Sequence, residues 1–241
     1  MRISDVTDKE FCNSRTKREV IMDWESKSKP AGLLCHPVGH YQGDTLVERL
    51  HYYFGDEARL VHRLDQNTSG LMVIARSLKV ARIFYKQFSH SKVHKEYCAL
   101  VHGIPKIKKG FIDFPLQPSE KPENIIKIKM EIHPNGMQSH TFYEVLQEFT
   151  KYSLLRVVPT TGRKHQIRKH LAFIGHPIVG EPLYFKGGLP FLWDYYMSRS
   201  SPWHIPIIGH CLSAYKIEFI HPMTEKVMNF TIPIPSNWQM F

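Results

Sequence analysis

A short apolar run at residues 71–75, LMVIA, constrains the fold more than any other feature of this chain. The run has no polar position, so we expect a strand that is buried on both faces in the middle of a sheet. Ser77 follows at a position suited to capping a helix. Apolar side chains then recur at helical spacing over residues 80–88, which predicts a helix with one face in the core.

Most of the remaining pattern indicates strands. Alternating or apolar runs predict strands at residues 126–132, 141–149, 152–158, 214–220 and 227–232. The first two runs flank Asn135-Gly136, a turn sequence typical of an antiparallel hairpin. Because strands outnumber helices and no βαβ rhythm is visible, we expect an α+β fold around a mostly antiparallel sheet.

One further helix is expected over residues 163–174. Thr161 can cap its start, and Gly175 marks its end. Residues 186–206 instead combine adjacent glycines with prolines and aromatic residues, so a long loop is expected there.

The composition is that of an ordinary globular protein, with 42% hydrophobic residues. No apolar run approaches the ~18 residues that cross a bilayer. Residues 1–19 are polar and lack periodicity, which indicates an irregular arm before a single domain at 20–241. This N-terminus also lacks the apolar core of a secretion signal, so a cytoplasmic protein is expected. The cysteines lie far apart and the histidines form no ligand motif, so we expect neither disulfides nor a metal.

The charge favours a polyanionic partner. Lys and Arg total 32 against 22 for Asp and Glu, which gives a net charge of +10. Such an excess suits nucleic acid or an acidic membrane surface, and it also occurs in basic proteins that bind neither.

The residues best suited to catalysis lie at 62–70, HRLDQNTSG, directly before the apolar run. Catalytic groups often lie on loops that a rigid strand anchors. Asp65 would be carried on such a loop, with Arg63 two residues away and Thr68 available to fix the turn. A structural Asx-turn with an exposed carboxylate would account for the same residues.

Four motifs resemble the RluA family of pseudouridine synthases. They are KPAGL at 29–33, HRLDQNTSGL at 62–71, KEYCALV at 95–101 and TGRKHQIRKH at 161–170, in the family order. The similarity continues through GHPIVGEPLY at 175–184 and covers roughly residues 20–235. Members often carry a separate small RNA-binding domain in front. The 19 preceding residues are too few for one, so the chain resembles the catalytic domain alone.

This resemblance implies an enzyme that isomerises uridine in ribosomal or transfer RNA to pseudouridine. The ribose leaves the base nitrogen and rejoins carbon 5 of the same base, so no cofactor is required. Asp65 would be the catalytic carboxylate, whether it attacks the sugar, attacks the base or assists glycal formation. A lone carboxylate fits this isomerisation better than hydrolysis, where two carboxylates normally divide the work.

By the same resemblance, Arg168 pairs with Asp65 and keeps it ionised and aimed. Tyr97 stacks on the target base and is a candidate for removing the proton from carbon 5. Arg63 fills the gap left by the flipped uridine, whose extrusion costs roughly a few kcal/mol. Without the resemblance, a solvated arginine and a tyrosine in a sheet core would be the ordinary interpretations of Arg168 and Tyr97.

Further substrate contacts are expected from two of the motifs, at His62, Thr68, Arg163, Lys164, His165 and Gln166. Arg163, Lys164 and His165, together with Lys127 and Lys129, are candidate phosphate contacts, although ordinary surface charge explains them equally. We expect a monomer that binds structured RNA, without a membrane or a metal, and whose affinity falls as salt rises.

Two other functions fit parts of the pattern. A non-catalytic RNA-binding or folding-assistance module would keep its cellular role after Asp65→Ala. A nucleoside or base hydrolase would use Asp65 as its nucleophile and release free uracil.

Overall fold

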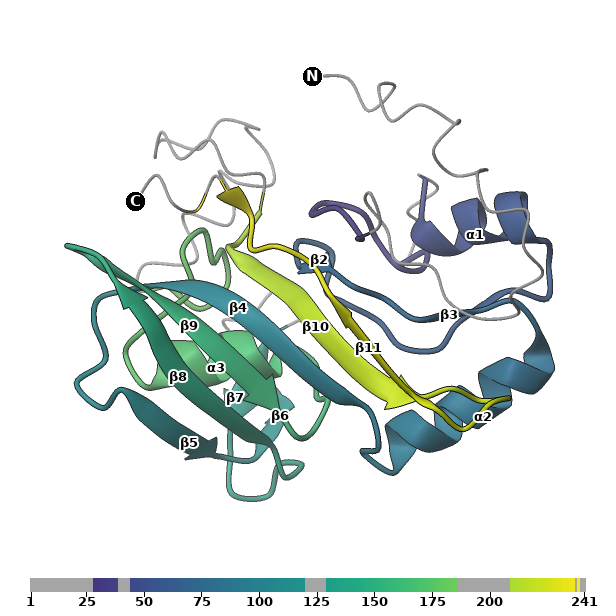
Figure 1. Cartoon of the computed structure of the whole chain (residues 1–241). Helices are drawn as coiled ribbons and strands as arrows, with labels where there is room; N and C mark the ends of the chain where they lie inside the picture. The colour runs from purple at the N-terminus through teal and green to yellow at the C-terminus, as the bar shows by residue number, and fades with distance from the viewer. Residues whose placement is uncertain (1–27, 39–43, 120–128, 186–208, 237, 239–241) are drawn as a thin grey trace.

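One large sheet forms the centre of the fold in the computed structural model, which describes residues 28–38, 44–119, 129–185, 209–236 and 238. Its strand order is β11-β10-β4-β9-β8-β5, and β2 also pairs with β10 (Figure 1). The strands are β2 Ser69–Gly70, β4 His94–His102, β5 Lys109–Asp113, β8 His140–Glu148, β9 Tyr152–Pro159, β10 Leu212–Ile220 and β11 Val227–Thr231. Every pairing is antiparallel except that of β2 with β10. The expected α+β fold around a mostly antiparallel sheet is confirmed.

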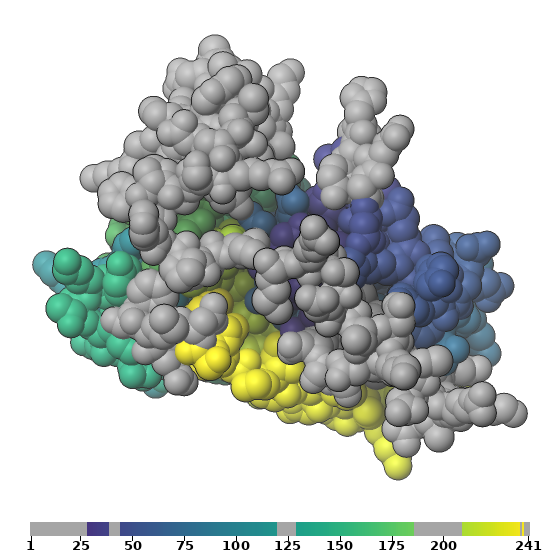
Figure 2. All heavy atoms as spheres, turned by 90° about the horizontal axis from the view of Figure 1, so that it is seen from above, coloured from purple at the N-terminus to yellow at the C-terminus, as the bar shows by residue number. Residues whose placement is uncertain are grey.

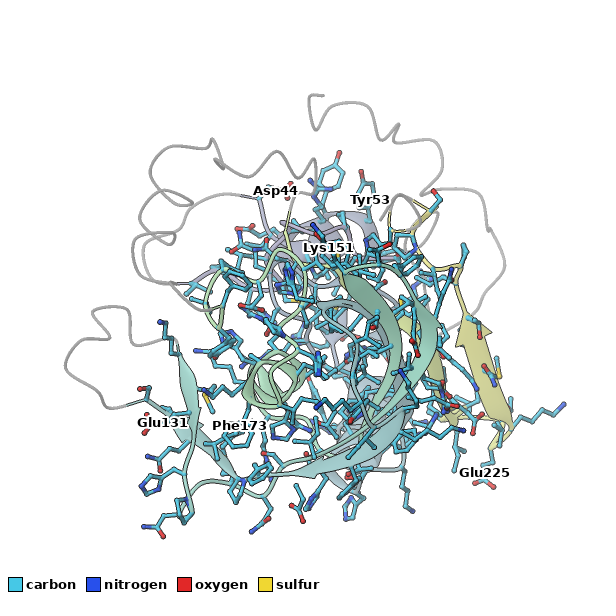
Figure 3. The ribbon with its side chains drawn as sticks, turned by 90° about the vertical axis from the view of Figure 1, so that its left-hand side faces the viewer. Asp44, Tyr53, Glu131, Lys151, Phe173 and Glu225 are labelled. Atoms are coloured by element: carbon cyan, nitrogen blue, oxygen red, sulfur yellow. The ribbon has the colours of Figure 1, made fainter. Side chains whose placement is uncertain are left out.

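The helices lie at two places on this sheet. Helix α3, Gln166–Phe173, lies inside the curve of the sheet, where Figure 3 views it along its axis. Its Ile167 and Leu171 join the core cluster built on β4 and β9. Helices α1, Leu46–Phe54, and α2, Leu78–Ser89, lie at the other end. Figure 2 shows these blue segments and the green β8–β9 region at opposite sides of the molecule.

The apolar run 71–75 is buried as predicted, but it is not a strand in the middle of the large sheet. Only Ile74–Ala75 forms a strand, β3, which pairs with β1, Arg59–Leu60, in a separate two-stranded sheet. Leu71 and Val73 pack into the cluster under α2, whereas Met72 and Ile74 pack into the cluster under α1. The run is apolar throughout because its side chains pack alternately into these two clusters. Periodicity alone cannot distinguish such a segment from a central strand.

The predicted hairpin around Asn135-Gly136 is also wrong in its pairing. Strand β7, Met130–Ile132, pairs with β6, Leu116–Pro118, and not with β8. Strand β8 lies between β5 and β9 instead. The turn at Gly136 brings the chain back to Leu116. A Cβ at Gly136 would lie within 3 Å of the Leu116 backbone.

The other predicted elements agree better with the structure. The strands expected at 152–158, 214–220 and 227–232 correspond to β9, β10 and β11, and Ser77 caps α2 with a 3.4 Å hydrogen bond. Helix α3 is shorter than expected and Thr161 is not its cap, because His165 precedes it with φ 53°. The Thr161 hydroxyl instead accepts from His140 N and donates to Gln166 Oε1.

An ion cluster fastens three strands on the face of β4 opposite α3. Glu96 is 3% exposed and accepts hydrogen bonds from side chains of β4, β9 and β10. Its partners are His94, Arg156, Tyr215 and Lys216. The Arg156 hydrogen bond, followed by those of the other partners, outweighs burial and lowers the pKa of Glu96.

Several expectations fall on residues that the structure does not describe. The arm at 1–19, the loop at 186–206 and Lys127 lie outside the described residues. Within the described part, no helix is long and apolar enough to cross a bilayer. The same residues contain no group of three His, Cys, Asp or Glu side chains that could hold a metal.

Candidate active site

A cavity of about 440 Å³ lies between the loop at 62–68, strand β4 and the start of α3. Segments that are far apart in the sequence therefore meet around one hollow. Its wall includes His62, Arg63, Asp65, Thr68, Lys95, Tyr97, Gly162, Arg163, His165, Gln166 and Arg168. Lys164, which was expected to bind substrate, is not part of this wall.

Lys29 holds the Asp65 loop in place. Its side chain is 0% exposed, and its ammonium donates to the carbonyls of Pro30, Leu33 and Gln66 at 2.8–2.9 Å. Burial lowers the pKa of Lys29 to about 8, so the ammonium is still charged at neutral pH. The turn at 29–33 is thus fastened to the residue that follows Asp65.

Gly70 fixes the other end of the loop. Its φ is +118°, and a Cβ there would lie 2.3 Å from the Ala214 carbonyl oxygen. Only glycine permits this conformation and this approach to β10. The segment that directly follows Asp65 is therefore held by Lys29 at Gln66 and by the approach to β10 at Gly70.

Arg168 joins Asp65 to a second, deeply buried carboxylate. Its Nη1 donates to Asp65 Oδ2 at 3.0 Å, while its Nε and Nη2 donate to Glu181 at 2.7 Å each. The Glu181 side chain is 0% exposed and also accepts from Leu183 N at 2.9 Å. In the described part of the chain, Asp65 Oδ1 receives no hydrogen bond and is available to a substrate.

The pKa of Asp65 is lowered from its ordinary value. Burial opposes ionisation, but the nearby His165 and Arg168 and the hydrogen bond from Arg168 outweigh it. Burial and the charge of Arg168 in turn lower the pKa of His165 to about 4, so its imidazole is neutral near pH 7. At neutral pH, Arg168 therefore supplies the positive charge that keeps Asp65 ionised.

Tyr97 faces the same cavity from β4. Burial, and then the negative charge of Asp65, raise the pKa of Tyr97 well above its ordinary value. The phenol is therefore protonated at neutral pH and presents a flat, uncharged ring beside the Asp65 carboxylate.

His62 and Thr68 make hydrogen bonds within the protein. His62 Nε2 accepts from Val73 N at 2.8 Å, and its ring stacks on Phe88. Burial, and then the charge of Lys95, lower the pKa of His62 to about 3, consistent with a neutral acceptor. Thr68 Oγ1 lies 2.9 Å from His210 Nε2. Both residues line the cavity, and His62 Nε2 and Thr68 Oγ1 are used in positioning the loop.

Gln166 is similarly occupied. Its Oε1 accepts from Thr161 Oγ1 and Arg163 N, and its Nε2 donates to His140 O and Thr141 Oγ1, at 2.8–3.0 Å. It supports the turn that precedes α3, and no hydrogen-bonding position is left for RNA.

The remaining expected contacts have different surroundings. Arg63 and Arg163 are exposed at the cavity, and Arg163 donates to Gln138 O at 3.2 Å. His165 Nδ1 lies 2.8 Å from the Tyr184 hydroxyl, with Nε2 3.9 Å from Asp65 Oδ2. Both arginines can still bind phosphate, whereas His165 lies within the pocket itself.

The sequence did not single out Glu181, Lys29 or His210 as parts of the site. Glu181 and Lys29 lie inside segments that resemble the family, and this position was the only sign in the sequence that they belong to the site. A charged residue inside such a motif can serve to position its neighbours. Only the fold shows that Glu181 holds Arg168 and that Lys29 holds the Asp65 loop.

The fold and these motifs define an RNA pseudouridylate synthase domain. The sequence model of the RNA pseudouridylate synthase family matches residues 27–173, and the chain belongs to this family. The RluA-type resemblance seen in the sequence is thereby confirmed.

Curated relatives and solved structures agree with this assignment. An uncharacterized RNA pseudouridine synthase of Chloroflexus aurantiacus is 37% identical over 220 residues, covering 88% of this chain and 64% of the relative. Ribosomal large subunit pseudouridine synthase D of Blochmanniella floridana is 32% identical over 217 residues, covering 87% and 66%. The chain thus spans slightly less than two thirds of these relatives' length. The solved structure of Human RNA Pseudouridylate Synthase Domain Containing 4 matches with a TM-score of 0.63 at 26% identity, covering 87% of this chain and 84% of that one.

Proposed function

We propose that this protein isomerises uridine in structured RNA to pseudouridine, with Asp65 as the catalytic carboxylate. One observation carries the proposal. Arg168 binds one oxygen of the ionised Asp65 and leaves the other facing a cavity that Tyr97 also lines. A single activated carboxylate of this kind suits nucleophilic or electrostatic catalysis at a sugar or a base.

The reaction requires no net gain or loss of atoms. The bond between N1 and the ribose C1′ breaks, a bond between C5 and C1′ forms, C5 releases a proton and N1 takes one up. Asp65 acts on the sugar, on the base, or as the base in glycal formation. In each case its low pKa provides the carboxylate that the step uses.

We assign Tyr97 to stacking on the target base. Its raised pKa disfavours the phenolate, so its flat ring suits contact with uracil better than it suits removal of the C5 proton. Arg168 is assigned to aiming Asp65.

The uridine must leave its helix to enter the cavity, at a cost of roughly a few kcal/mol. Arg63 lies exposed at the cavity, where it can occupy the gap that the base leaves. We propose ribosomal or transfer RNA as the substrate, acted on in the cytoplasm by a monomer without a metal. The Blochmanniella relative is named for the ribosomal large subunit.

Carbodiimide mapping of pseudouridine in total RNA tests this proposal. The cells carry the intact protein, a deletion, Asp65→Ala, or Asp56→Ala as a control on an exposed aspartate. Loss of the same site or sites in the deletion and Asp65→Ala strains, with normal maps for Asp56→Ala, is expected and would also identify the RNA. Unchanged maps in all strains would contradict the proposal, and release of free uracil would indicate a hydrolase.

A further inference from the structure

The cavity extends beyond Asp65 to the junction of α2 and β4, which lie end to end in Figure 1. We call Ser89, Ser91, Lys95 and Gly162, which line this part of the cavity, its far wall. A second hollow of about 170 Å³ also borders Ser91 and Lys95. Lys95 therefore lies in the wall that the two hollows share, on the same face of β4 as Tyr97.

Lys95 has no counter-charge of its own. In the described part of the chain its ammonium makes no hydrogen bond or ion pair, and the Phe88 ring centroid lies 6.0 Å from Nζ. Burial lowers the pKa of Lys95. A charge removed from water is costly unless an opposite charge meets it, so an anionic ligand would stabilise this position.

The surroundings carry an excess of positive charge. Among the described residues that line the cavity, Asp65 is the sole carboxylate, and it is paired with Arg168. Arg63, Lys95 and Arg163 line the same cavity without a carboxylate partner in that part of the chain. The far wall thus attracts an anion, whereas the Asp65 end does not.

The turn at Gly162 provides a second donor. A Cβ at Gly162 would lie 3.8 Å from Lys95 Nζ, so the ammonium faces this turn. Within the described residues, the Gly162 N–H donates no hydrogen bond. An ammonium and a free backbone N–H close together in one cavity wall match the acceptor oxygens of a phosphate group.

We propose that Lys95 and the Gly162 turn bind one of the two phosphodiester groups that flank the target uridine. This inference rests on the proposed function and adds a binding site to it. The bound phosphate fixes the backbone on one side of the flipped nucleotide, while the base reaches Tyr97 and Asp65.

A linkage-by-linkage binding experiment tests the site. The probe is a synthetic RNA stem–loop that contains the uridine identified by mapping, with each flanking phosphodiester replaced in turn by an uncharged methylphosphonate. Affinity is measured for Asp65→Asn protein, which leaves the uridine intact, with and without Lys95→Gln. Lys151→Gln, an exposed change at the β8–β9 turn, is the charge-matched control.

With Lys95 present, neutralising one flanking linkage is expected to weaken binding roughly tenfold. Lys95→Gln should weaken binding of the unmodified RNA by a similar factor, and neutralising that linkage should then have no further effect. The slope of log affinity against log salt concentration should also fall by about 0.7. Lys95→Arg should retain the linkage dependence, and Lys151→Gln should leave it unchanged.

The proposed site would be overturned if neutralising either flanking phosphodiester weakened RNA binding equally, and by the same factor with Lys95 as with Lys95→Gln. If Lys95→Gln does not fold, Lys95→Met keeps the buried stem without the charge and decides the same question. An intact protein that forms pseudouridine but shows no dependence on Lys95 overturns only this site. A protein that forms no pseudouridine overturns the proposed function itself.

Discussion

Arg168 binds Glu181 at two points and Asp65 at one. The two bonds to Glu181 are 2.7 Å long and the bond to Asp65 is 3.0 Å. Because Glu181 is fully buried and does not line the cavity, the direction of the guanidinium is set from behind the site. Through Arg168, the Asp65 carboxylate is thus oriented by Glu181, which does not line the cavity.

Glu181→Gln should therefore impair catalysis without a change in the cavity wall. The amide keeps the shape but removes the charge that faces Arg168, so the free energy of unfolding should fall by about 3 kcal/mol. The single-turnover rate should fall at least roughly tenfold, with a smaller change in RNA affinity. Denaturant unfolding and rate measurements check this. Glu148→Gln, at an exposed pair with Lys108, should change stability by less than about 1 kcal/mol. A normal rate in folded Glu181→Gln protein would contradict the positioning role.

The acid side of the pH–rate profile should report the Asp65–Arg168 pair. In the proposed function the rate depends on ionised Asp65, whose lowered pKa should keep the rate high until the pH falls below the ordinary aspartate value of about 4. Arg168→Lys loses the fixed hydrogen bond to Asp65, so burial should raise the pKa and move the acid limb to higher pH. Rates should be measured only where circular dichroism shows folded protein. Arg163→Lys should leave the limb in place, and an unmoved limb in Arg168→Lys would count against the pairing.

Buried histidines should make the fold sensitive to mild acid. Burial, and then the charge of Arg168, lower the pKa of His210 to about 4. The unfolded chain takes up the proton near pH 6.5 while the folded protein does not, so stability present above pH 6.5 is lost as the pH falls toward 4.

The loss from His210 alone should be roughly 2 kcal/mol between pH 7 and pH 5. His210→Gln should flatten the dependence of unfolding free energy on pH over this range. His90→Gln, at an exposed position, should not. Parallel curves for intact and His210→Gln proteins would contradict the lowered pKa, because they would mean that His210 binds its proton equally well in the folded and unfolded states.

Two glycines with positive φ should differ in their tolerance of alanine. Gly55 has φ +81°, and a Cβ added there would have no atom within 4 Å, so Gly55→Ala should cost about 1–2 kcal/mol from the backbone alone. Gly70→Ala adds a clash with Ala214 and should cost at least about 3 kcal/mol, with loss of activity because Asp65 moves. Thermal unfolding compares the two. Similar losses would mean that β10 can move away from the loop.

The elements that sequence predicted well are those whose pattern is local. The stripe of α2 and the alternation in β9 to β11 depend on neighbours within one element. The run 71–75 and the segment before Asn135-Gly136 were misassigned because their partners lie far along the chain. Met130–Ile132 is a good strand sequence, but nothing in it specifies pairing with Leu116–Pro118.

The site shows the same division. Asp65, Tyr97 and Arg168 were found through motifs, and they do meet at one cavity. Gln166 and His62 were expected to bind RNA because they lie in those motifs, yet both amide atoms of Gln166 and the Nε2 atom of His62 are bound within the protein. Motifs contain both reacting and supporting residues, and only hydrogen-bond partners separate the two.

The alternation of side chains along β4 limits where residues can be inserted into or deleted from this protein. Lys95 and Tyr97 face the cavity, while Glu96 between them is bound by Arg156, Tyr215 and Lys216 on the other face. Inserting or deleting one residue here would bring the Glu96 carboxylate to the cavity and carry Tyr97 into the ion cluster. Insertions and deletions should therefore be confined to the connections between strands, and that is where differences in RNA choice between relatives can accumulate.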